Sequence, residues 1–144
     1  MARSFASSPP GAGAAAAAFA SAASDPEVQR SWVGYVGGES IERIGAGMAQ
    51  ALSGVIPDEV MAGWFLTTRA DPSQAPPGCH TAFLWVSVPP CPRRWRGRSL
   101  DGWRAWRALA EPLADAVTDR FAELAPGFRD LILERHVNTP LDQE

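Results

Sequence analysis

The sequence predicts an α+β fold in which an antiparallel or mixed sheet carries helices on one face. Three observations lead to this prediction. Short apolar runs rich in aromatic and β-branched residues alternate with two segments whose apolar residues recur every three or four positions. Clusters of glycine and proline separate these segments. The expected order of elements is βαββαβ in a chain of 144 residues, which is long enough for one domain.

The N-terminal segment offers little to a core. Residues 1–24 are nearly all Ala, Ser, Gly and Pro, so we expect a disordered, low-complexity tail there and a folded part over 31–144. Residues 11–16 match the pattern G-x-G-x-x-[GA] of dinucleotide-binding loops. Such a loop works only after a buried strand, and SSPP precedes it here, so we interpret the match as part of the tail.

The first strand and the first helix are expected directly after the tail. Residues 32–36 are apolar and aromatic and end at two glycines, which is typical of a short strand. Ser40 is placed to cap a helix over 41–53, where apolar residues lie at helical spacing. A glycine and then a proline follow, as expected at a helix end.

A proline-rich loop joins the next two predicted strands, 64–69 and 81–88. Proline fixes φ, glycine permits positive φ, and an aspartate can bond the backbone two residues on, so the loop over 71–81 is expected to be rigid. The loop positions that matter below are Asp71, Pro72, Ser73, Ala75, Pro76, Gly78 and His80.

The last part of the chain predicts a long helix and a final strand. Apolar residues recur at helical spacing over 103–124, and Pro112 predicts two helices or a kink there. Residues 135–139 are the last strand candidate. Before the helix, residues 93–98 hold four arginines around a tryptophan. We interpret them as a solvated loop, with an anion- or nucleic-acid-binding loop as the alternative.

Composition narrows the functional classes. The net charge of −3 gives no electrostatic case for nucleic-acid binding, and no apolar run is long enough to cross a membrane. Cys79 and Cys91 lie at the two ends of a predicted strand, which argues against a disulfide. The sequence therefore predicts a cytoplasmic protein and leaves peripheral membrane association open.

No constellation of catalytic or metal-binding residues is recognisable. The chain has no GxSxG nucleophile motif, and neither His80 nor His136 stands at metal-ligand spacing from a second ligand. Cys79 precedes His80, but neighbours on a strand point to opposite faces. We assign no catalytic, cofactor-binding or metal residue on these grounds.

Several segments, in order, resemble one region of the phytoene-desaturase-like FAD-dependent oxidoreductases. Within them the chain is most similar to the pyridine nucleotide-disulfide oxidoreductase domain-containing protein 2 group. The resemblance rests on residues 38–57, on DPSQAPPGCHTAFLWV at 71–86, on LAPGF at 124–128, and on RHVNTPLDQE at 135–144. It implies that residues 31–144 are part of a substrate-binding domain and that the loop over 71–81 is a family marker.

The resemblance also implies a cofactor and a substrate class. Full-length members would use FAD to oxidise or desaturate a lipophilic substrate. This chain has no counterpart of their strand–GxGxxG–helix or of their later glycine-rich segment, so we expect a fragment that binds no FAD and is inactive alone. The uncovered side of such a fragment is expected to favour self-association.

Five aromatic residues are the candidates for a substrate-lining surface. They are Trp64, Phe83, Trp85, Trp103 and Trp106. The alternative is that they pack the sheet against its helices. A different functional class also stays open, namely a non-enzymatic α+β module that binds another protein through the tryptophans or through residues 93–98.

Overall fold

A computed structural model describes the backbone of residues 2–7 and 31–143 and the side chains of 31–143. One five-stranded sheet has the order β2-β3-β4-β1-β7, and every pairing in it is antiparallel. Its strands are Ala2–Ser7 (β1), Val33–Val36 (β2), Ala62–Leu66 (β3), Cys79–Val86 (β4) and Ile132–Val137 (β7). Arg94–Trp95 (β5) and Arg98–Ser99 (β6) form a separate hairpin.

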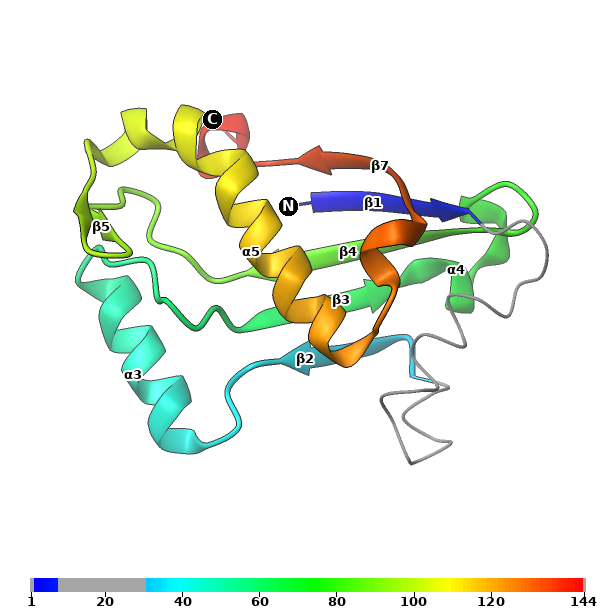
Figure 1. Ribbon diagram of the computed structural model, residues 1–144, viewed down its shortest axis with the longest axis horizontal. Coiled ribbons are helices and arrows are strands. Elements are labelled where there is room, and N and C mark those ends of the chain that lie inside the picture. Colours follow the sequence, from blue (N-terminus) through cyan, green and yellow to red (C-terminus); the bar gives the residue numbers. More distant parts are fainter. Residues whose placement is uncertain (1, 8–30, 144) are drawn as a thin grey trace.

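The helices have unequal roles. The α-helices are Ile41–Leu52 (α3), Thr67–Ala70 (α4) and Trp106–Leu124 (α5), and the 3₁₀ turns are Pro72–Gln74 (η1), Gly102–Ala105 (η2), Phe128–Leu131 (η3) and Pro140–Gln143 (η4). Figure 1 shows α5 crossing one face of the sheet, while α3 lies beyond its end next to β5. The predicted α+β class and the antiparallel sheet are confirmed.

Alternation along two central strands explains the core. In β3, Trp64 and Leu66 are buried, and the register places Trp64 opposite Leu84 of β4. This face packs on α5, because the Trp64 ring lies 6.1 Å from that of Phe121 in an edge-on arrangement. Phe121 in turn meets Phe128 at 4.6 Å, which fixes the turn after α5. One side of the sheet thus supplies the core, as the period of two requires.

The segment Ala2–Ser7 differs from the expectation for the N-terminus. It forms β1 between β4 and β7 and pairs with both, whereas residues 1–24 were expected to be a tail outside the fold. The physical reason is that the facing edges of β4 and β7 need partners for their N–H and C=O groups, and any extended backbone can supply them. The rest of the predicted tail, including residues 11–16, lies outside the described residues.

Two boundaries also differ from expectation. Residues 67–70 form the short helix α4, so β3 ends at Leu66 and the strand expected over 64–69 is shifted. The helix α5 runs from Trp106 to Leu124 with Pro112 inside it, so of the two alternatives expected there, two separate helices are not formed. Buried contacts of α5 on both sides of the proline hold the helix together.

An ion-pair network ties the edge strand β7 to α5. Arg135 donates to Asp115 at 2.8 Å and also pairs with Glu111. Arg129 pairs with Asp119 at 2.6 Å and with Asp115 at 3.8 Å. The Arg135 side chain is largely shielded, so these charge-assisted bonds are screened less by solvent than an ordinary surface pair.

Candidate functional site

The face of the sheet turned away from α5 carries aromatic and apolar side chains that range from half-buried to exposed. The register places Phe65 of β3 between Val33 of β2 and Phe83 of β4. In the neighbouring row, Tyr35 and Trp85 are 63% and 55% exposed. We call the surface made by these five residues the aromatic floor. A patch of this composition is typical of a binding surface rather than of a solvated sheet face.

A glycine shapes the middle of the aromatic floor. Gly63 pairs with Tyr35 on one side and with Trp85 on the other. A Cβ atom at Gly63 would lie 3.2 Å from Cε1 of Tyr35, so the tyrosine ring leans over the glycine. The absence of a side chain at Gly63 thus makes room for the tyrosine ring.

A cavity of about 770 Å³ opens at one end of the aromatic floor. Ala2, the first described residue of β1, pairs with Leu84 of β4 and with Val137 of β7. Trp85 and Val86 follow Leu84, so β4 extends beyond the described part of β1. Its lining comes from β3, α4, β4, α5, β7 and the segment after β7, with one residue of α3, and it includes Phe65, Phe83, Trp85, Leu113 and Val117. The volume is within the range of pockets for small molecules.

One polar group of this cavity has an unusual environment. The Oγ1 atom of Thr67, a lining residue, is buried without a hydrogen-bond partner among the described residues. Buried hydroxyl groups are normally satisfied, so a water molecule or a ligand oxygen is the natural partner. The neighbouring Thr68 hydroxyl differs, because it lies 3.0 Å from Nδ1 of His80. His80 is therefore engaged in a structural contact.

The helix α3 presents an exposed apolar stripe. The stripe consists of Ile41, Met48 and Leu52. These positions align because an α-helix turns by about 100° per residue. Arg43 lies on the opposite side of α3 and pairs with Glu39, and Glu39 also pairs with Arg120 of α5.

The loop between β3 and β4 is rigid for the reasons expected from its sequence. Asp71 accepts hydrogen bonds from the Ser73 hydroxyl at 2.6 Å and from the Ser73 N–H at 3.1 Å. The N–H of Cys79 donates to the carbonyl of Pro76 at 2.9 Å, and Gly78 has φ of 81°. This is a type II turn, which needs positive φ at its third position.

The Asp71 side chain gives the loop a pH-dependent stability. Hydrogen bonds from the Ser73 hydroxyl, then the Ser73 N–H and the Gln74 amide, lower the pKa of Asp71. A lowered pKa means that the carboxylate stabilises the loop at neutral pH and that this contribution is lost as the pH falls through the folded-state pKa. The Asp71→Ala variant should show severalfold faster amide exchange at Ser73 at neutral pH.

Asp71→Asn is the matched control for that measurement, because its side-chain oxygen still accepts the Ser73 hydrogen bonds. It should retain part of the protection. The difference between Asp71→Ala and the wild type should shrink in acid, once Asp71 is protonated. Equal exchange rates in the three proteins at neutral pH would contradict the role given to the carboxylate.

The structure separates the five predicted lining residues into two groups. Phe83 and Trp85 belong to the aromatic floor, and with Trp106 they line the cavity. Trp106 is also a core residue whose Nε1 donates to the carbonyl of Pro90 at 2.7 Å. Trp64 packs in the core against α5, and Trp103 lies on η2 and is partly exposed. Tyr35 was not among the residues predicted to line a binding surface. Exposed and buried side chains alternate between Tyr35 and Val36 in β2, and this alternation could have identified it.

The described residues provide neither a metal site nor a disulfide. No group of three His, Cys, Asp or Glu side chains within residues 31–143 is placed to hold a metal ion. Cys79 and Cys91 are both free thiols. No helix in this part of the chain is both long and apolar enough to cross a membrane.

The helix termini in the described residues do not fit the pyrophosphate of FAD. A dinucleotide site requires free N–H groups and no negative charge at a helix N-terminus. At α3, Ser40 already accepts from the N–H of Arg43, and Glu39 and Glu42 stand beside it. At α5, the preceding turn η2 runs directly into the helix, and the N–H of Trp106 donates to the carbonyl of Trp103. FAD binding by this part of the chain is therefore disfavoured.

Comparison with known proteins shows a partial similarity to a curated protein. The chain is 34% identical over 80 residues to the mouse (Mus musculus) protein named "Pyridine nucleotide-disulfide oxidoreductase domain-containing protein 2". The match covers 55% of this chain but only 13% of the mouse protein. No family model matches the sequence, and no solved structure matches it. The chain thus has a family-level link to an oxidoreductase-type protein, through a stretch that is a small part of that protein.

Proposed function

We propose that the chain is the substrate-facing part of an FAD-dependent, phytoene-dehydrogenase-like oxidoreductase. The partial similarity to the mouse protein supports the oxidoreductase lineage. The observation that carries the proposal is the aromatic floor, a partly exposed apolar sheet face whose residues Phe65, Phe83 and Trp85 also line a cavity of about 770 Å³. In such an enzyme the cofactor performs the redox chemistry and the protein positions the substrate against it.

The character of the cavity supports a lipophilic substrate. Phe65, Phe83 and Trp85 offer an apolar surface, and burying it against an apolar ligand would contribute roughly 25 cal/mol per Å². The Thr67 hydroxyl is the polar group placed to orient one oxygen-bearing end of the ligand. No described side chain is assigned a catalytic role, so this segment would bind and orient the substrate and exclude water.

The flavin is expected to come from protein outside the matched stretch. Purified alone, the chain should be colourless and should not bind added FAD. A longer product of the same gene, expressed with the adjoining coding sequence, should retain flavin and show its visible absorbance.

The competing class is a protein-interaction module, in which the aromatic floor docks a protein. A colourless longer product that stays monomeric would favour this class and contradict the proposal. Saturable FAD binding by the short chain would contradict the argument from the helix termini but would leave the oxidoreductase lineage intact. The two results are thus distinguishable.

A further inference from the structure

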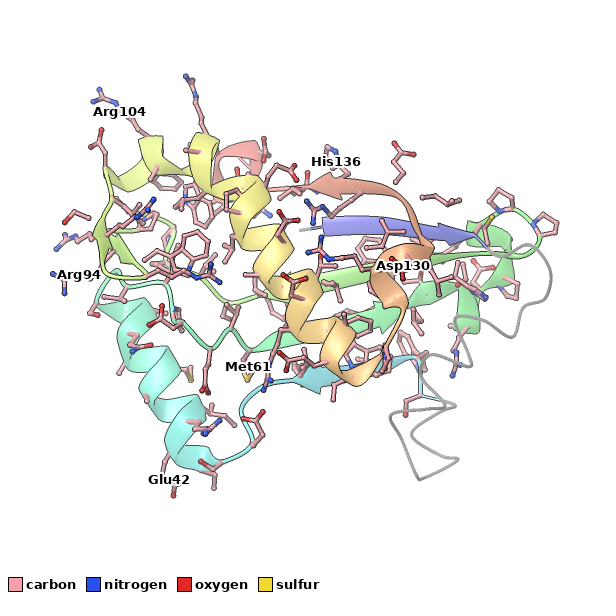
Figure 2. All side chains as sticks on the ribbon, in the orientation of Figure 1. Glu42, Met61, Arg94, Arg104, Asp130 and His136 are labelled. Carbon is pink, nitrogen blue, oxygen red and sulfur yellow. The ribbon has the colours of Figure 1, made fainter. Side chains whose placement is uncertain are left out.

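Four arginines gather on the β5–β6 hairpin at one end of the molecule. They are Arg93, Arg94, Arg96 and Arg98, and all four side chains are exposed. Among the described residues none of them forms an ion pair, although other arginines of the chain do. The chain as a whole has a net charge of −3, so this hairpin is a local exception. Figure 2 shows Arg94 projecting from the end of the molecule beyond α3.

The hairpin is held in a fixed conformation. Trp95 is buried, and the Arg96 guanidinium lies 4.7 Å from its ring centroid. Arg96 and Gly97 both have positive φ, at 46° and 74°, which is the geometry of a tight hairpin turn. The carbonyl of Arg94 also accepts from the N–H of Ile56 at 2.9 Å. The arginines are therefore presented on a rigid support, unlike charges on a loose loop.

Exposed apolar side chains lie next to this charge. The N–H of Arg93 donates to the carbonyl of Gly54 at 2.7 Å, so the hairpin is joined to the C-terminal end of α3. Leu52, in the last turn of α3, is 90% exposed, and Met48 lies one turn before it. Glu39, Glu42 and Glu59 lie at the opposite end of α3, and Asp58 is the acidic residue that lies beside its later turns, near Gly47 and Gln50. We call Met48, Leu52 and the four arginines the basic–apolar corner.

We infer that the basic–apolar corner docks on an anionic lipid surface. Interfacial binding combines apolar side chains that enter the acyl boundary with basic residues that contact phosphates. Guanidinium groups suit this role because they bind phosphate oxygens in pairs. An acidic polypeptide would satisfy the arginines but would give no reason for Leu52 to protrude beside them. This inference does not depend on the proposed oxidoreductase function.

The test is flotation of the full chain with vesicles of phosphatidylcholine alone or with added phosphatidylserine. Binding is expected only when phosphatidylserine is present, and salt should weaken it. The double variant Arg96→Gln, Arg98→Gln should bind roughly thirtyfold more weakly, since each basic residue near an anionic surface contributes about 1 kcal/mol. Leu52→Ser should weaken binding by about tenfold or more.

Two matched control variants test whether vesicle binding depends on this corner or only on the charge and the exposed apolar side chains of the protein as a whole. Arg104→Gln, Arg107→Gln removes the same charge from exposed positions outside the corner and should have little effect. Leu133→Ser removes another exposed leucine side chain, 61% exposed in β7, and should leave binding unchanged. Circular dichroism checks that each variant is folded. If the double variant Arg96→Gln, Arg98→Gln does not fold, Arg94→Gln takes its place in the test.

Three results would overturn the inference. The first is no binding to phosphatidylserine vesicles. The second is equal loss in the two arginine double variants. The third is wild-type vesicle binding by Leu52→Ser together with full competition by polyglutamate, which would instead point to an acidic protein partner.

Discussion

Replacing Phe121 by alanine is expected to lower the free energy of unfolding by about 3–5 kcal/mol. Phe121 is fully buried and packs edge-on against both Trp64 and Phe128, so it joins α5 to the sheet and to the turn that follows. Removing the ring leaves a cavity that its rigid neighbours cannot fill. Denaturant unfolding followed by circular dichroism measures the loss. Since small domains are stable by only about 5–15 kcal/mol, this loss is a large fraction of the total stability.

Leu124→Ala is the matched control for Phe121→Ala. It lies in the same helix, one turn later, but its side chain is 41% exposed. The expected loss is well under half of that for Phe121. A Phe121→Ala variant as stable as Leu124→Ala would contradict the packing of α5 on the Trp64 face of the sheet.

Placing proline at Ser4 is expected to destabilise the protein by roughly 1–3 kcal/mol or more, through unmade hydrogen bonds in the middle of the sheet. The register places Ser4 opposite Ala82 of β4 and Arg135 of β7, so β1 has partners on both sides. Proline lacks the N–H and is found in sheets essentially only at edges or bulges. Thermal unfolding of Ser4→Pro measures the effect.

The control at this position is Ser4→Ala, which keeps the backbone N–H. A large loss for proline and a small loss for alanine would support a paired strand. Proline that leaves the melting temperature unchanged would contradict the placement of β1 between β4 and β7.

The sequence allowed the elements that depend on local patterns to be predicted. Ser40 caps α3 through the N–H of Arg43, and apolar periodicity located both long helices. The turn at Pro76 to Cys79 follows from proline and glycine at the positions that a type II turn needs. These features are determined by a few consecutive residues, so they can be read without tertiary information.

The features that were missed depend on distant partners. The strand β1 has the composition of a tail, and only the facing edges of β4 and β7 make it a strand. The β5–β6 hairpin is held by backbone contacts with Gly54 and Ile56, about forty residues earlier in the chain. Pro112 predicted a break, but buried residues on both sides of it keep α5 continuous.

Prediction of the candidate site was limited in the same way, because the site also depends on contacts between residues far apart in the sequence. The sequence identified Phe83 and Trp85 as lining candidates, and both lie on the aromatic floor. It could not separate them from Trp64, because the face that α5 covers follows only from the assembled sheet. The family resemblance pointed to the loop at Asp71, whose hydrogen bonds within the loop give it a structural role.

The aromatic floor and its cavity are proposed to bind a lipophilic ligand. The most direct test is titration with cis-parinaric acid, a polyene fatty acid whose fluorescence rises in apolar surroundings. The wild type should bind it saturably, and Trp85→Ser should bind at least about tenfold more weakly, since an aromatic contact contributes roughly 1.5–3 kcal/mol. Leu133→Ser, which alters an exposed side chain that does not line the cavity, should bind like the wild type. No saturable binding, or equal affinity in the wild type and Trp85→Ser, would contradict the claim.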